Sequence, residues 1–174
     1  PDEVMVIRIS ADSPASVCLD CFIDGREERY DDNRPCGENM LLFNGGAGSR
    51  DGIFFAAVLG AVNTGGTLRT VGNHIRIEKA DEVMLVLSAR TSFYGEGYER
   101  SAVADVEMAL KSTWDDLYSR HANDYRSLFN RVELALNDNS GNSAAELPTD
   151  RRIQRLRGNE LDNKECDRLI RDNK

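Results

Sequence analysis

Residues 112–136 read STWDDLYSRHANDYRSLFNRVELAL, the most informative stretch in the chain. Its apolar side chains recur every three or four residues, which predicts an amphipathic helix over residues 113–130. Ser112 and Asp115 stand in the S-x-x-D relation of an N-terminal capping pair. After the helix, apolar residues alternate and predict a short strand at 131–136. The apolar face of the helix, here called the aromatic stripe, consists of Trp114, Leu117, Tyr118, His121, Tyr125, Leu128 and Phe129.

The residues that precede this helix have the pattern of β structure. Gly65-Gly66 and Gly72-Asn73 allow positive φ and predict tight hairpins. Residues 52–62 are apolar on both faces, which predicts a central strand covered from two sides. The polar, Gly-rich residues 25–38 and 44–51 are predicted to be surface loops. The expected strands are 3–10, 16–24, 39–43, 52–63, 67–71, 74–79 and 82–89.

Further helices are predicted on either side of the long one. Residues 101–111 predict a short helix, and Thr149 is expected to cap a helix from Asp150 to about Arg157 that ends at Gly158. Residues 137–147 have the composition of a flexible loop. The fold class is therefore predicted as mainly β with C-terminal helices (α+β), an antiparallel β-sandwich followed by linker helices.

Several short segments resemble one enzyme family in the same order along the chain. Residues 120–136 are similar to the "RH…DY…LF.RV.L.L" segment of glycoside hydrolase family 95, the α-L-fucosidase family. The other similar segments are 1–16, 52–56, 80–93 and 147–151. Each motif is short, but together they extend over residues 1–158.

The resemblance implies a domain organisation. In this family an N-terminal β-sandwich is joined by a helical linker to a large helical barrel, which carries the catalytic acid and base. By resemblance, residues 1–93 are part of the sandwich and residues 94–158 are the helical linker, with the short strand at 131–136. Residues 159–174 depart from the family's sequence and are expected to form a polar tail. The resemblance therefore leaves no catalytic residue in this chain.

The aromatic stripe has a structural and a functional interpretation. At this spacing aromatic residues are typical of a core, so the stripe is expected to pack against the sandwich or against the family's barrel. Without the barrel, part of the stripe would form an exposed apolar patch that allows self-association. His121 is expected to be a core histidine bonded to a carbonyl or carboxylate, with Asp124 as a candidate partner.

Composition excludes several classes of protein. The chain has 174 residues, 40% apolar and 30% charged residues and a net charge of −8, which suits one soluble domain. Its acidity argues against a nucleic-acid partner. No run of 18 apolar residues is present, so no membrane span is expected. No signal peptide is visible at Pro1, and the sequence assigns no compartment.

The four cysteines are predicted to be free thiols. Cys18 and Cys21 form a C-x-x-C, a spacing that often indicates zinc or redox chemistry. Here the pair lies in an alternating strand, where residues three apart point to opposite faces and cannot share a metal. Cys21 is therefore expected in the core. Cys36 and Cys166 supply no second pair of ligands, and neither metal nor cofactor is expected.

The search for a site centres on carboxyl groups and aromatic rings. Glycoside hydrolysis needs two carboxyl groups about 5 to 10 Å apart. Asp81-Glu82 lies in a predicted exposed turn, and Glu96 and Glu99 lie in the loop 93–99. In that loop Tyr94 and Tyr98 are possible carbohydrate contacts, because aromatic faces stack on sugar rings. The competing interpretation is a plain surface connection. The Gly-rich residues 44–49 lack the lysine of a phosphate loop.

The sequence therefore predicts the non-catalytic N-terminal domain and linker of an α-L-fucosidase-like glycoside hydrolase. The expected partners are a fucosylated glycan, bound by the parent enzyme, and the helical barrel. The chain alone is predicted to be inactive. One alternative is a free-standing β-sandwich that binds carbohydrate or protein, and another is a related family with a different sugar specificity.

Overall fold

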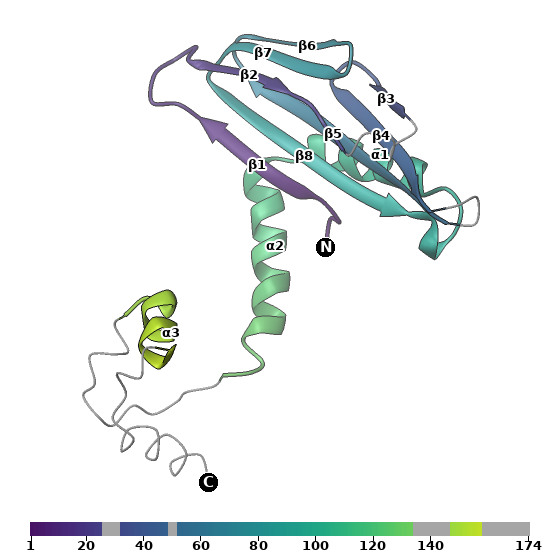
Figure 1. Cartoon of the computed structure of the whole chain (residues 1–174). Helices are drawn as coiled ribbons and strands as arrows, with labels where there is room; N and C mark the ends of the chain where they lie inside the picture. Colours follow the sequence, from purple (N-terminus) through teal and green to yellow (C-terminus); the bar gives the residue numbers. More distant parts are fainter. Residues whose placement is uncertain (26–31, 49–51, 134–146, 158–174) are drawn as a thin grey trace, which may run out of the picture. The chain divides into compact units, whose positions relative to one another are not determined.

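The computed structural model describes residues 1–25, 32–48, 52–133 and 147–157. The chain divides into two compact units, Pro1–Arg131 and Val132–Lys174. The second unit contains one described helix, α3 (Thr149–Arg157). All the other described elements belong to the first unit, which is the part that carries the sandwich (Figure 1).

The first unit is built on two antiparallel sheets. The large sheet has the strand order β1-β8-β5-β4-β3, and the small sheet has the order β2-β7-β6. The strands of the large sheet are β1 (Met5–Ser10), β3 (Asp32–Pro35), β4 (Met40–Ala47), β5 (Ile53–Thr64) and β8 (Glu82–Thr91). Those of the small sheet are β2 (Val17–Cys21), β6 (Thr67–Val71) and β7 (His74–Ala80). The predicted fold class is confirmed.

An apolar core fills the space between the sheets. Side chains of one parity along each strand meet there, because successive residues of a strand point to opposite faces. Leu59 of β5 and Ile77 of β7 are buried in this core, and Cys21 packs against it as predicted. Burial raises the pKa of the Cys21 thiol. Cys18, three residues away, is exposed, and Cys18, Cys21 and Cys36 are free. Cys166 lies outside the described residues.

The other face of the large sheet is covered by helix α1 (Tyr98–Leu110). Ala102, Val106 and Ala109 point into the sheet and are buried with Val58 of β5. A Cβ added at Gly60 would lie 2.6 Å from Val106 Cγ1 and 2.8 Å from Leu110 Cδ1. The absence of a side chain at Gly60 therefore lets the helix approach the sheet closely. β5 is thus central, as predicted, and both of its faces are covered in its middle part, Val58–Ala61.

Five predicted details are wrong. Residues 32–35 form the edge strand β3, and β4 extends to Ala47, although both segments were expected to be loops. Gly65 and Gly66 have positive φ but carry the chain from β5 to β6 in the other sheet, so they form no hairpin. α1 begins at Tyr98, before residue 101. Residues 131–133 are not a strand, and the remainder of that prediction lies outside the described residues.

Another error concerns the start of the long helix α2 (Trp114–Phe129). Its cap is Thr113, whose Oγ1 accepts a hydrogen bond from Asp116 N at 3.2 Å. The predicted pair of Ser112 and Asp115 is one residue out of phase. Thr113 Oγ1 also donates a hydrogen bond to Asp116 Oδ2 at 2.7 Å, so this hydroxyl is bonded to both the backbone and the side chain of Asp116.

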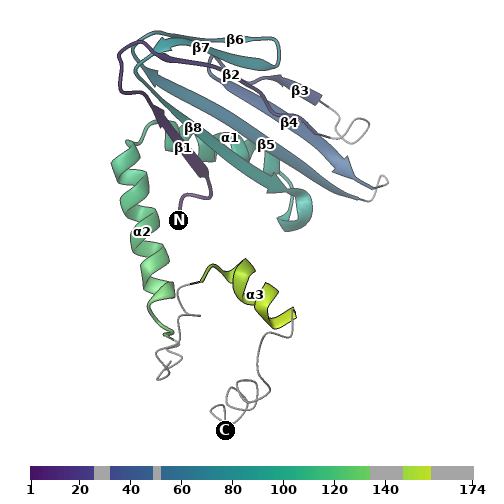
Figure 2. The same ribbon diagram turned by 60° about the vertical axis from the view of Figure 1, so that its left-hand side comes forward.

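α2 contacts the sandwich only at its first turns. Leu117 is buried in the core between α1 and the large sheet, and Trp114 packs against that core. Beyond Leu117, every side chain of α2 is exposed except the half-buried Ala122. Figures 1 and 2 show α2 running away from the large sheet. The expectation that the whole aromatic stripe packs on the sandwich is therefore wrong for Tyr118, Tyr125, Leu128 and Phe129.

Candidate functional site

Three of the four carboxyl groups considered from the sequence have structural partners, and the fourth, Glu96, is exposed. Asp81 Oδ1 accepts a hydrogen bond from Ala15 N at 2.7 Å, and Glu82 Oε2 pairs with Arg8 Nη2 at 2.6 Å. Glu99 Oε1 accepts from Asn44 Nδ2 at 2.6 Å. The first bond joins the β1–β2 connection to the β7–β8 turn, the second joins β1 to β8, and the third joins β4 to α1, so all three carboxylates have structural roles.

A polar cluster fixes α1 to strand β8. The carboxylate of Asp105, whose side chain is 12% exposed, accepts hydrogen bonds from Arg90 Nε at 2.8 Å and from Ser88 Oγ at 3.0 Å. The bond to Asp105 raises the pKa of Arg90. Ser88 is buried, so its hydroxyl needs the partner that Asp105 provides. These bonds fix α1 to β8, so the role of Asp105 in this cluster is structural.

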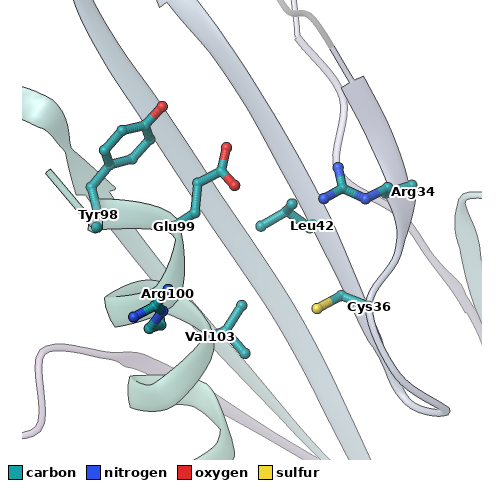
Figure 3. Close-up of a pocket in the computed structure, with 8 residues that line it drawn as sticks. Arg34, Cys36, Leu42, Tyr98, Glu99, Arg100 and Val103 are labelled. Atoms are coloured by element: carbon teal, nitrogen blue, oxygen red, sulfur yellow. The ribbon is translucent and has the colours of Figure 1, made fainter.

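A groove of about 490 Å³ lies where the N-terminus of α1 faces strands β3 and β4 (Figure 3). Leu42, Val103 and Cys36 supply its apolar surface. Arg34, Tyr98, Glu99 and Arg100 supply polar groups. Arg34 is paired with Asp32 of its own strand. Apolar surface with a few polar groups at the rim is the composition of a small-molecule site.

The structure separates the two tyrosines singled out from the sequence. Tyr98 is the first residue of α1, is half-buried and lines the groove. Tyr94 is in a short 3-10 helix (Ser92–Tyr94), is 93% exposed and is not among the groove residues. The ring of Tyr94 meets the ring of Phe93 edge to face, with centroids 5.0 Å apart. Only Tyr98 is therefore placed where it could contact a ligand in the groove.

Arg120 has a role that the sequence reasoning missed. Its Nε lies 3.0 and 3.1 Å from the two carboxylate oxygens of Asp2, so the second turn of α2 is tied to the residues before β1. Near it, the guanidinium of Arg8 lies 6.0 Å from the ring centroid of Trp114. Arg120 is part of the family-like motif, which marked it in the sequence. Its partner Asp2 could not be predicted, because it lies 118 residues away along the chain.

His121 is exposed, so the expectation of a core histidine is wrong. Its ring lies 6.2 Å from that of Tyr125, and Tyr125 is stacked on Phe129 with centroids 5.1 Å apart. The aromatic stripe thus carries two ladders of rings along α2, Trp114–Tyr118 and His121–Tyr125–Phe129. Aromatic rings arranged this way on an open helix face form a surface that is suited to burial against another element.

The described part of the chain contains no cluster of three or more side chains able to bind a metal ion. None of the described helices is both long enough and apolar enough to cross a membrane.

Comparison with known proteins connects these features. Residues 1–96 match the family model described as glycosyl hydrolase family 65, N-terminal domain. Residues 113–170 match the model described as glycosyl hydrolase family 95 catalytic domain, and this match runs past Gly158, where the motif resemblance ends. The chain is 27% identical to Alpha-L-fucosidase 2 of Arabidopsis thaliana over 86% of its own length. It spans only 21% of that relative.

The first match covers more than half of the chain, and the second begins at the cap of α2. The family 65 N-terminal domain model covers the residues that form the sandwich. The match to the family 95 model agrees with the family that the sequence motifs resemble. The chain therefore belongs to the family of glycosyl hydrolase family 65 N-terminal domains, and its residues 113–170 are similar to the family 95 catalytic domain.

Proposed function

We propose that this chain is a non-catalytic supporting region of an α-L-fucosidase, in which the sandwich and α2 hold the catalytic domain in place. The longer enzyme would hydrolyse terminal α-L-fucosyl linkages, the activity named for the Arabidopsis relative. The carboxyl groups with described partners in this region are tied into structural bonds, which supports a role in scaffolding and not in catalysis.

The observation that carries the proposal is that α2 has an anchored N-terminal part and an exposed C-terminal part. Its first turns are anchored to the sandwich by Leu117 and by the Arg120–Asp2 pair. The rest of its aromatic stripe has no cover within the first unit. The match to the family 95 catalytic domain begins at residue 113, where this helix is capped. Helix α2 is thus built into the sandwich at one end and belongs by sequence to the catalytic domain.

An exposed ladder of aromatic rings needs cover in the native protein, since large contiguous apolar patches mark interaction surfaces. We infer that the catalytic domain covers Tyr125, Leu128 and Phe129. The proposal predicts that the isolated chain self-associates through the same surface, because the catalytic domain that would cover this surface is absent.

The test compares residues 1–174 with a longer protein that contains them. The isolated chain should release no product from an aryl α-L-fucoside, whereas the longer protein should be active. In the longer protein, Phe129→Asp should lower the thermal midpoint by several degrees. Met108→Asp is the matched control, because Phe129 and Met108 are both 63% exposed in the chain. Turnover by residues 1–174, or equal effects of the two substitutions, would overturn the proposal.

The groove at the N-terminus of α1 supports a second candidate, a site for carbohydrate on the sandwich. Its apolar surface suits the C–H face of a sugar ring, and Glu99 and Arg100 supply an acceptor and donors for hydroxyl groups. Titration of the chain with fucosylated oligosaccharides by calorimetry tests this candidate. Binding that is lost in Tyr98→Ala and retained in Tyr94→Ala would support the groove, and an absence of heat would exclude it.

A further inference from the structure

The inner face of the large sheet, which is turned toward the small sheet, is only partly covered. One part of this face packs on the small sheet and forms the core with Leu41, Leu59 and Val83. Further along the same strands, apolar side chains on the same face are exposed or only half-buried in the described part of the chain. These residues, here called the open face, are Met5, Ile7, Ile53, Phe55, Ala57 and Ala89.

The strand register places the open face next to the intersheet core. Met5 is paired with Leu87, and Leu87 with the buried Leu59. In the neighbouring row, Ala89 is paired with Ala57. Directly paired residues project from the same side of a sheet, so these side chains form one surface with the core.

The open face is apolar but exposed to solvent. In the chain, Met5 is 60% exposed, Ile7 48% and Ile53 46%. Every second residue of β1, β5 and β8 points to this face, and none of these residues is charged over the full length of the three strands. A single exposed apolar residue needs no explanation, but a row of them across three adjacent strands does.

The outer face of the small sheet shows what a solvent face of this protein looks like. It carries Asp20, Arg69, Arg76 and Glu78, which form ion pairs with one another: Arg76 Nη2 lies 2.7 Å from Asp20 Oδ2, and Arg69 Nη2 lies 3.7 Å from Glu78 Oε2. An antiparallel sheet with one solvated face has polar residues on that face. The open face lacks them, so it has the sequence of a buried face.

The small sheet also has a free edge beside this surface. β2 is paired with β7 on one side, and no described strand is paired with its other side. In both views the ribbon of β2 lies between the β6–β7 hairpin and the part of the large sheet with no ribbon over it (Figures 1 and 2). A strand added at this edge would extend the small sheet over the open face. Unpaired N–H and C=O groups of an edge strand are a template for such pairing.

We propose that at least one further strand of the same sandwich, from the part of the longer polypeptide outside residues 1–174, is paired with the free edge of β2 and buries the open face. This inference rests on the proposed function, in which the chain is one region of a larger glycoside hydrolase; the chain spans 21% of its relative, which leaves ample polypeptide. The strand would present alternating apolar side chains. A glycan is a poor occupant, because the open face offers no charged group for orientation.

Methionine oxidation, read out by peptide mass spectrometry, tests the proposal. In residues 1–174, hydrogen peroxide should oxidise Met5 and Met108 at similar rates, because they are 60% and 63% exposed, while Met40 and Met84, each 7% exposed, react slowly. In the longer protein the rate at Met5 should fall at least tenfold. An unchanged rate at Met5 overturns the proposal. Protection of Met5 in residues 1–174 that grows with protein concentration also overturns it, in favour of a second copy.

A pair of charge substitutions gives an independent readout. Ile7 and Val71 are 48% and 47% exposed in the chain, so Ile7→Asp and Val71→Asp should have similar, small effects on the thermal midpoint of residues 1–174. In the longer protein Ile7→Asp should lower the midpoint by several degrees more than Val71→Asp. Equal shifts would contradict a buried open face. Fucosidase activity is measured separately, so a protected Met5 in an inactive protein would sink the proposed function and leave this inference standing.

Discussion

Helices α1 and α2 follow each other directly in the chain but are packed in different ways. α1 has weak apolar phasing, yet its small residues Ala102 and Ala109 and the buried Val106 lie flat on the large sheet. α2 has a regular aromatic stripe, yet only Leu117 is buried. The difference shows that amphipathic spacing tells which face of a helix is to be covered. It does not tell what covers it.

The largest expected effect is on α1. Val106→Asp would place a charge in the core between helix and sheet, without a partner, and should cost more than about 4 kcal/mol, so that the chain fails to fold. Circular dichroism and urea unfolding would measure this. Met108→Asp, on the exposed side of the same helix, should change stability by less than about 0.5 kcal/mol. Similar losses for the two variants would show that α1 is not packed as described.

A smaller loss is expected where α2 meets the sandwich. Leu117→Ala should lower the free energy of unfolding by about 2 to 4 kcal/mol, because it leaves a cavity beside α1. Leu128→Ala, on the exposed part of the same stripe, should lower it by less than about 0.5 kcal/mol in the isolated chain. If the two substitutions had equal effects, the division of α2 into an anchored and an open part would be wrong.

The polar contacts of the two helices should also differ. Asp105→Asn removes the negative charge that faces Arg90 in a largely buried pair and should cost about 2 kcal/mol, with little dependence on salt. Double-mutant cycles with Arg90→Met would isolate the pairwise contribution. A loss that disappears in 0.5 M salt would mean that the pair is open to solvent.

The smallest effect is expected at the other end of the comparison. Asp2→Asn weakens the pair with Arg120, whose side chain is 43% exposed, so global stability should change less than in Asp105→Asn. Amide hydrogen exchange is the sharper measurement, because the second turn of α2 should exchange faster in the variant while α1 is unchanged. Faster exchange throughout α1 would contradict this local role.

Much of the sandwich could be predicted, because the apolar residues along most of its strands follow the pattern in which those strands are buried. β5 is apolar on both faces and is buried on both faces in its middle part, and Gly72 makes the predicted turn between β6 and β7. β3 was missed because an edge strand of three polar residues and a proline has no apolar pattern, and its assignment comes only from pairing with β4. The groove beside Tyr98 was predicted only in part. Tyr98 was singled out from the sequence as a carbohydrate contact, but Arg34 and Cys36 are brought to the groove by the pairing of β3 with β4.

By itself the sequence determined the local elements and the family-like motifs, because periodicity, caps and turn residues act over a few neighbours along the chain. Tertiary structure alone decided which sheet each strand joins, that Arg120 binds Asp2, and that the open face and the end of α2 lie uncovered. The physical reason is that burial depends on residues distant in sequence. An apolar side chain predicts that its position is buried, but only the tertiary packing shows which surface buries it.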